Sequence, residues 1–200
     1  MTNIAVFLDR DGTINEEVGY LDQIEKLKIF PNAYGAIRLI NDSGMKAVVV
    51  SNQAGVARGF FTEEFVVSIN DLMQSDLNKQ GAKIDKFYYC PHHPEEGKGI
   101  YLRNCDCRKP APGMLLQAAA ELNIDLARSY LIGDRFLDVE TARKAGAKGI
   151  LVKTGYGESL LQDDGPDTAT PDNKPDFIAA DILDAVHWIL KDKQGNKPRV

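Results

Sequence analysis

The chain has 200 residues, which is enough for one α/β domain with a substantial core, and its 44% hydrophobic and 26% charged residues are the usual balance of a globular protein. Its net charge of −5 offers no basic surface for nucleic acid, although a local basic patch can still bind a small anion. The longest apolar runs are too short to span a bilayer, and no signal peptide precedes the first strand, so we expect a cytoplasmic protein without a membrane partner.

The first half of the chain alternates short apolar runs with amphipathic segments. Apolar runs rich in β-branched residues indicate buried strands, and segments with helical spacing and a helix-start residue indicate helices. In chain order we predict a strand at 4–8, a loop at 15–30, a helix at 31–42, a strand at 46–50 and a helix at 62–80. Pro31 suits the first turn of its helix, and Thr62 before two glutamates is typical of an N-cap. Strand–helix–strand units of this kind are right-handed and parallel.

The second half of the chain continues the same alternation. We predict a strand at 84–89, an irregular segment at 91–112, a helix at 112–122, a strand at 130–132, a helix at 139–145, strands at 149–152 and 177–179, and a helix at 181–190. Residues 155–175 are rich in Gly, Pro, Asp and Thr, which predicts a surface loop. The whole pattern predicts an α/β fold with a doubly wound parallel sheet. We expect one domain over residues 1–190 and a polar, frayed tail over 191–200.

Polar side chains follow three of the predicted strands. Asp9 and Asp11 come after the first strand, Ser51 and Asn52 after the second, and Asp134 after the fourth. Because the carboxyl ends of parallel strands lie along one edge of a sheet, where open α/β sheets bind ligands, these groups should meet. Buried carboxylates are costly to desolvate unless a metal, hydrogen bonds or chemistry stabilises them. The sequence therefore predicts one polar site at this edge.

The residue types at this edge suit a divalent cation and a phosphate. Mg²⁺ prefers oxygen ligands, so we expect it on the carboxylates of Asp9 and Asp134 and the carbonyl of Asp11. With the charge neutralised, Asp9 can attack phosphorus and form an aspartyl-phosphate. Asp11 can then protonate the leaving alcohol and afterwards deprotonate the hydrolytic water. Lys109, Ser51 and the backbone amides around Asn52 are candidates to hold the phosphoryl oxygens.

A second metal site is predicted in the irregular segment, over residues 90–107. Its candidate ligands are Cys90, His92, Cys105 and Cys107. Three cysteines close together beside a histidine do not resemble a secreted disulfide framework. Three thiolates and one imidazole satisfy tetrahedral Zn²⁺ with no open position, which is a structural arrangement, although three reduced cysteines without metal are the alternative. The segment leads directly into Arg108 and Lys109, so a bound zinc ion would fix these cations beside the polar edge.

Four segments in this order resemble the motifs of the haloacid dehalogenase (HAD) superfamily. They are Asp9-Arg10-Asp11-Gly12-Thr13, Ser51-Asn52, Lys109 before a helix, and Gly133-Asp134 with Asp138. Residues 7–15, 51–59 and 105–110 resemble, more narrowly, the phosphatases of this superfamily that are related to histidinol phosphatase. The resemblance covers residues 4 to about 155. It implies a HAD-like Rossmannoid fold with a zinc-binding loop.

The resemblance also implies roles for individual residues. It makes Asp9 the nucleophile and Asp11 the acid and base, places Mg²⁺ on Asp9, Asp11 and Asp134, and makes Ser51 and Lys109 phosphoryl stabilisers. It adds substrate contacts at Glu17, Val18, Gly19 and Tyr20, at Ser51, Asn52, Gln53 and Ala54, and at Arg108. Arg135 stands where relatives often carry lysine; the positive charge is kept, but a planar fork replaces a point charge.

We therefore expect a Mg²⁺-dependent phosphatase with a structural zinc ion that acts as a monomer on a small sugar phosphate. The gaps after the first and third motifs are too short for a large cap domain, so the crevice should be open. The resemblance implies removal of the 7-phosphate of D-glycero-D-manno-heptose 1,7-bisphosphate, a step of lipopolysaccharide heptose biosynthesis. Histidinol phosphate is the alternative substrate. A receiver-type signalling domain is the non-enzymatic alternative, but Asp11 and the predicted zinc loop have no place in one.

Overall fold

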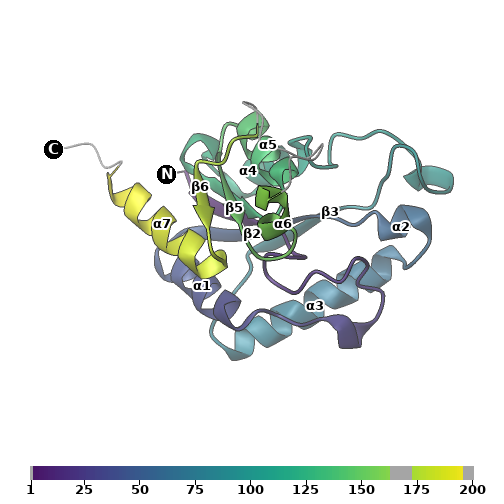
Figure 1. Ribbon diagram of the computed structural model, residues 1–200, viewed down its shortest axis with the longest axis horizontal. Helices are drawn as coiled ribbons and strands as arrows, with labels where there is room; N and C mark the ends of the chain where they lie inside the picture. The colour runs from purple at the N-terminus through teal and green to yellow at the C-terminus, as the bar shows by residue number, and fades with distance from the viewer. Residues whose placement is uncertain (1, 163–172, 196–200) are drawn as a thin grey trace.

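The computed structural model describes residues 2–162 and 173–195, and these form a sheet of parallel strands covered by helices on both faces (Figure 1). The six strands of this part of the chain are β1 (Ala5–Leu8), β2 (Lys46–Asn52), β3 (Lys86–Cys90), β4 (Tyr130–Gly133), β5 (Lys148–Val152) and β6 (Phe177–Ala179). Their order across the sheet is β3-β2-β1-β4-β5-β6, and every pairing is parallel. This confirms the predicted doubly wound sheet.

The helices form two layers because alternate residues of each strand point to opposite faces of the sheet. The helix bounds are α1 (Pro31–Asp42), α2 (Gly55–Arg58), α3 (Glu63–Lys79), α4 (Gly113–Leu122), α5 (Phe136–Ala145), α6 (Gly157–Gln162) and α7 (Ile182–Gly195). Val6 and Leu8 pack with α1, α3 and α7, whereas Ala5 and Phe7 pack with α4 and α5. Both faces of β1 are buried, which explains its unbroken apolar sequence. Short 3₁₀ helices lie at Ile24–Lys26, Gly99–Tyr101 and Leu126–Arg128.

Two short helices, α2 and α6, were not predicted. Two others, α5 and α7, begin or end at residues that differ from the prediction. The four-residue α2 follows β2, and α6 occupies part of the predicted loop at 155–175, of which residues 163–172 lie outside the described residues. Helix α5 begins at Phe136 rather than at residue 139, because Asp138 Oδ2 accepts the backbone N–H of Arg135 and caps the first turn.

The last helix continues past the predicted boundary at residue 190. Helix α7 ends at Gly195, so the expectation of a frayed tail from residue 191 is wrong for residues 191–195. Asp192 holds this turn in place, because it accepts hydrogen bonds from Tyr130 Oη at 2.8 Å and from Lys148 Nζ at 2.6 Å. The rest of the predicted tail, 196–200, lies outside the described residues.

The segment between β1 and α1 is irregular, as predicted, but it is fastened to the sheet. Glu16 N donates to Lys28 O and Phe30 N donates to Ile14 O, each at 2.9 Å. These hydrogen bonds close residues 16–28 into a loop beside the carboxyl end of β1. None of the helices in the described ranges is long and apolar enough to cross a membrane.

Replacing Ser129 by alanine tests how the central strands are joined. The fully buried Ser129 Oγ accepts the Ala5 N–H at 3.0 Å and donates to Asp125 O at 2.6 Å. Ser129→Ala leaves the buried Ala5 N–H without this acceptor, so the free energy of unfolding should fall by about 1–3 kcal/mol in chemical denaturation. Ser68→Ala is the matched control, because its exposed hydroxyl bonds to a carbonyl of its own helix. That control should change the free energy of unfolding by less than about 0.5 kcal/mol. Equal losses in the two variants would contradict a stabilising role of the Ser129 hydroxyl.

Candidate active site

The predicted polar groups meet at the carboxyl edge of the sheet. Asp9 follows β1, Asp134 follows β4, and Ser51 lies near the end of β2; β1 pairs with both of the other strands. The strand order reverses direction here, which is where open α/β sheets bind ligands. A cavity of about 310 Å³ lies at this edge and is lined by these three residues together with Asp11 and Lys109. The described residues form no separate domain over it.

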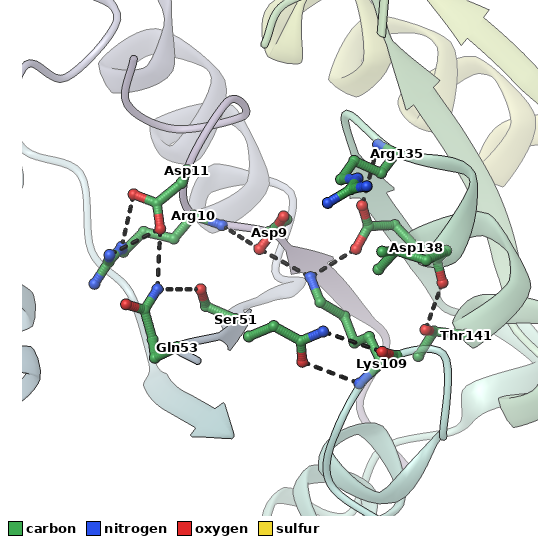
Figure 2. Close-up of polar contacts among 11 residues, drawn as sticks. Asp9, Arg10, Asp11, Ser51, Gln53, Lys109, Arg135, Asp138 and Thr141 are labelled. Atoms are coloured by element: carbon green, nitrogen blue, oxygen red, sulfur yellow. Dashed lines mark hydrogen bonds and ion pairs between the residues drawn. The ribbon is translucent and has the colours of Figure 1, made fainter. Parts of the chain in front are cut away.

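A buried lysine connects two of the acids. Lys109 Nζ lies 2.8 Å from Asp9 Oδ1 and 2.6 Å from Asp138 Oδ1 (Figure 2), and the residue is only 3% exposed. Burial alone would lower the pKa of Lys109, but the charges of Asp138 and Asp9 raise it above its usual value. The ammonium is therefore charged. Asp9 Oδ1 also accepts the Arg10 N–H at 2.8 Å, so two donors fix the orientation of this carboxylate.

The neighbouring carboxylates repel one another. Oxygen atoms of Asp9, Asp134 and Asp138 lie within 4.8 Å of each other, and all three side chains are largely buried. Burial raises the pKa of Asp9 to about 7 although Lys109 opposes it, and burial with the charges of Asp9 and Asp138 raises the pKa of Asp134 to about 8. Three carboxylates and one ammonium carry a formal charge of −2 when ionised. A divalent cation fits this charge, and an all-oxygen donor set suits Mg²⁺.

Two glycines allow the chain to approach Asp134 closely. A Cβ atom on either Gly12 or Gly155 would lie 2.1 Å from Asp134 Oδ2, and both residues have positive φ, +80° and +57°. Both positions therefore require glycine for steric and conformational reasons. The next backbone N–H, that of Tyr156, donates to Asp134 Oδ2 at 2.9 Å. The loop after β5 thus packs on the acid that follows β4.

Four N–H groups hold the Asp11 carboxylate. Oδ1 accepts from Arg10 Nε at 3.2 Å and Asn15 Nδ2 at 2.9 Å, and Oδ2 accepts from Arg10 Nη2 at 2.8 Å and Gln53 Nε2 at 2.9 Å. Figure 2 shows the contacts with Arg10 and Gln53. Burial alone would raise the pKa of Asp11, but the Arg10 charge and these hydrogen bonds lower it below its usual value. Asp11 is therefore ionised and oriented. Arg10 is itself 2% exposed and reaches Asn70 of α3.

The side chain of Asn52 binds the backbone next to it rather than pointing freely into the cavity. Its Nδ2 donates to Lys109 O and its Oδ1 accepts the Lys109 N–H, both at 3.0 Å. This reciprocal pair fastens the end of β2 to the segment that carries the buried lysine. The sequence predicted that the backbone around Asn52 holds phosphoryl oxygens and that Asn52 contacts the substrate. The structure adds that its side chain fixes the backbone of Lys109.

Most of the predicted substrate-contact residues line the cavity. They are Glu17, Gly19, Tyr20, Ser51, Asn52, Gln53, Ala54, Arg108, Lys109 and Arg135. Among the described residues of the 17–20 segment, Val18 does not line it; its side chain is 39% exposed, and its carbonyl accepts the Tyr20 N–H in a tight turn.

Sequence reasoning missed two polar residues of the cavity wall, Arg58 and Tyr156, and also the lining residues Leu21, Gly55, Phe61 and Leu137. Arg58 lies over the ring of Tyr20 at 5.6 Å from its centroid, and Arg135 lies over the ring of Tyr156 at 5.2 Å. Arg58 belongs to the segment 51–59 that resembles known phosphatases, and this signal would have found it. Tyr156 lies in a predicted surface loop, and no motif around it indicates a residue of the site.

The four predicted thiol and imidazole ligands lie together. The three Sγ–Sγ distances among the cysteines are 3.1, 3.3 and 3.5 Å, and His92 Nδ1 lies 3.6 Å from Cys90 Sγ and 3.3 Å from Cys107 Sγ. These separations are too long for a disulfide. With Zn–S bonds near 2.3 Å, tetrahedral ligands lie about 3.8 Å apart, so the cluster is close to the size that zinc requires. The hydrogen bond with Cys90 lowers the pKa of Cys107 to about 5, which favours a thiolate there.

The thiol cluster is connected to the polar edge through Arg108. Its Nη1 donates to His92 O at 3.2 Å, and Lys109 follows it in sequence. Gly113 N donates to Asp106 O at 2.8 Å, which holds the start of α4 against the same loop. His93, beside the predicted ligand, accepts the Glu96 N–H at 2.9 Å and is not a member of the cluster found among the described residues.

Comparison with known proteins identifies relatives over nearly the whole chain. The HAD-hydrolase-like family model matches residues 106–185. The D-glycero-beta-D-manno-heptose-1,7-bisphosphate 7-phosphatase of Yersinia pestis is 45% identical over 153 residues, 76% of this chain and 81% of the relative. The enzyme of the same name from Vibrio cholerae is 39% identical over 195 residues, 97% and 100% of the two chains. The crystal structure of D,D-heptose 1,7-bisphosphate phosphatase from B. bronchiseptica, complexed with magnesium and phosphate, superposes with a TM-score of 0.79 at 29% identity and covers 94% of this chain and 99% of that one.

The crowded carboxylates predict an unusual pH dependence of stability. In the folded state the pKa values of Asp9 and Asp134, about 7 and about 8, exceed their usual value of 3.8, so between about pH 6 and 8 the folded chain binds more protons than the unfolded chain. Without divalent metal, these two groups should therefore make the free energy of unfolding fall by about 4 kcal/mol as pH rises through this window. Denaturant titrations at several pH values in magnesium-free buffer measure this.

Asp134→Asn is the matched variant for this measurement. It removes one of the repelling charges and keeps an oxygen that can accept the Tyr156 N–H. The variant should be more stable than the wild type at pH 8 and should lose most of the pH dependence. Equal pH dependence in the two proteins would contradict the proposed repulsion.

Proposed function

Because this chain belongs to the D-glycero-D-manno-heptose-1,7-bisphosphate 7-phosphatase family of HAD-like hydrolases, we propose that it removes the 7-phosphate of D-glycero-D-manno-heptose 1,7-bisphosphate. The observation that carries the proposal is the meeting of Asp9, Lys109 and Asp134 at the end of the central strands, with Asp9 and Lys109 2.8 Å apart. Membership of a family of phosphoric monoester hydrolases rules out the alternative of a receiver-type signalling domain. Histidinol phosphate is the alternative substrate that the assay below tests.

A magnesium ion is part of this proposal. The carboxylates of Asp9 and Asp134 and the carbonyl of Asp11 are the groups that would hold it. The support is the formal charge of −2 on the three buried acids and Lys109, the raised pKa values of Asp9 and Asp134, and a related structure complexed with magnesium and phosphate. When bound, the ion neutralises charge and so lets a phosphate dianion approach a carboxylate.

The proposed reaction has two chemical steps on the chain's own residues. In the first, a carboxylate oxygen of Asp9 attacks phosphorus, the bond to the sugar oxygen breaks, and Asp11 gives that oxygen a proton. In the second, Asp11 takes a proton from water, whose oxygen attacks the aspartyl-phosphate and frees Asp9 and inorganic phosphate. Asp11 is ionised because its pKa is lowered, and the second step requires the ionised form. For the first step Asp11 must take up a proton, which the charge of an arriving phosphate dianion favours.

Other residues of the cavity position the substrate in this proposal. Ser51 and Lys109 hold phosphoryl oxygens, where charge develops during transfer. Arg108 and Arg135 bind the remainder of a doubly phosphorylated sugar, and the Glu17 carboxylate accepts from its hydroxyl groups. The open wall of the cavity leaves room for this second end of the substrate.

We also propose a structural zinc ion on Cys90, His92, Cys105 and Cys107. The spacing of the ligand atoms and the full set of four ligands support it. Its role is to hold the loop that ends in Arg108 and Lys109. The cytoplasmic location and the monomeric state of the chain stay predictions.

A substrate panel with active-site variants tests the proposed reaction. With Mg²⁺, the wild type should release phosphate from heptose 1,7-bisphosphate faster than from histidinol phosphate. Asp11→Asn should reduce kcat by about 10²–10⁴-fold, because it removes the group that transfers the proton, and Asp9→Asn should reduce it further. Asp71→Asn, an exposed change on α3, is the control and should be fully active. Near-normal turnover by Asp9→Asn would overturn the mechanism, and faster turnover of histidinol phosphate would overturn the substrate.

Removing one thiol tests the coupling between the zinc loop and the site. Cys107→Ser should lower the zinc content measured by metal analysis, lower the melting temperature, and reduce kcat because Arg108 and Lys109 lose a fixed anchor. His93→Ala is the control, since this neighbouring imidazole bonds to its own loop. A variant that lost zinc and kept full turnover would show that the loop does not position the cations.

A further inference from the structure

The carboxamide of Gln53 lies between two groups that the proposed reaction uses. Its Nε2 lies 2.7 Å from Ser51 Oγ and 2.9 Å from Asp11 Oδ2 (Figure 2), and the residue is only 4% exposed. The backbone of Gln53 is fixed on both sides. Its N–H donates to Cys90 O of β3 at 2.8 Å, and its carbonyl accepts the Val56 N–H of α2 at 3.2 Å. This residue is therefore fixed in the wall of the cavity.

The number of donors on the carboxamide limits what Gln53 can do. A carboxamide nitrogen carries two hydrogens, and here one is directed to Ser51 and the other to Asp11. No N–H of this group is left over for a substrate. The contacts therefore favour a different role from the substrate contact that the sequence resemblance implies for Gln53.

The contact to Ser51 sets the direction of the serine proton. A hydroxyl has one proton to donate and two lone pairs that accept. Because a lone pair of Ser51 Oγ accepts the Gln53 N–H, the serine proton is directed away from Gln53 and is available to an oxygen in the cavity that Ser51 lines. The same carboxamide holds one oxygen of Asp11. Gln53 thus fixes the separation between a phosphoryl-oxygen donor and the proton-transfer group.

We propose that Gln53 is a positioning residue of the phosphatase reaction, which orients the Ser51 hydroxyl toward the phosphoryl group and holds Asp11 in register with it. The inference rests on the proposed function, in which Ser51 and Asp11 act on the phosphate ester. Preorganised donors act on the chemical step because they need no rearrangement as charge develops. Gln53 therefore contributes to kcat and not to recognition of the sugar.

The residue type is specific to this task. Asparagine lacks one methylene and would not reach both acceptors from the same backbone position. Glutamate keeps the length but offers acceptors only when ionised, so it would attract the serine proton away from the cavity and place a negative charge beside Asp11.

Gln53→Met tests the proposal, because methionine has a similar length and no N–H. Rates are measured with heptose 1,7-bisphosphate and with p-nitrophenyl phosphate, which lacks the sugar. We expect kcat to fall by about tenfold to a hundredfold with both esters while KM changes by less than about twofold. A rise in KM with the sugar substrate alone, at unchanged kcat, would instead make Gln53 a substrate contact and overturn the proposal. Gln117→Met, on the exposed face of α4, is the matched control and should leave both rates unchanged.

A double-mutant cycle with Ser51→Ala tests the route of the effect. If Gln53 acts in part through the Ser51 hydroxyl, the loss in the double variant is smaller than the product of the two single losses. A loss equal to that product would overturn the Ser51 part of the proposal.

A second variant keeps the test readable if Gln53→Met fails to fold. Gln53→Glu preserves the shape of the side chain and should lower kcat with both esters, because it reverses the hydrogen bond to Ser51; unchanged kcat would overturn the proposal.

The aryl ester also separates this inference from the proposed substrate. Hydrolysis of p-nitrophenyl phosphate without hydrolysis of heptose bisphosphate would contradict the proposed substrate alone, and the effect of Gln53→Met would still be measured on the aryl ester.

Discussion

The ammonium of Lys109 is the interaction on which the arrangement of the site depends. It is almost fully buried and pairs with Asp9, which follows β1, and with Asp138, which lies in the first turn of α5. A buried charge is costly unless it is paired, so each partner keeps the others in place. The lysine backbone is fixed in turn by the side chain of Asn52. The ends of β1 and β2 and the first turn of α5 are thereby joined through one residue of a loop, and displacing that loop would leave two acids without their cation.

The two clusters of candidate metal ligands differ in chemistry, and therefore in what a bound ion could do. The thiols and imidazole offer soft ligands and fill four positions, so an ion there can fix the chain but has no open position for a substrate. The carboxylates offer hard oxygen ligands and line an open cavity, so an ion there can also contact a phosphate. Arg108 connects the clusters, because it bonds to the backbone of His92 and lies next to Lys109 in the chain. An ion in the thiol cluster would thus also restrain Arg108 and Lys109.

The sheet could be predicted from the sequence because its strands are short apolar runs buried on both faces, and parallel strands bring their polar ends to one edge. The same reasoning placed Asp9, Ser51 and Asp134 together, since it needs only strand direction. It did not find that Arg10, Asn15 and Gln53 surround Asp11, because those contacts depend on side-chain positions at a turn and in the segment after β2, which hydrophobic periodicity does not report. The ends of α5 and α7 were misplaced for a similar reason: Asp138 and Asp192 stabilise these turns through contacts with specific partners.

The charges that line the cavity explain how an acidic protein can bind a dianion. Among the described lining residues, the acids are Asp9, Asp11, Glu17 and Asp134, and the cations are Arg58, Arg108, Lys109 and Arg135. Four charges of each sign balance when all are ionised, so the cavity alone provides no net attraction for a phosphate. A divalent cation bound among the acids would give the cavity a net charge of +2, which balances the charge of a phosphate dianion. Binding of the metal and of the phosphate should therefore be mutually dependent, while the arginines farther along the wall can bind a second phosphate without the metal.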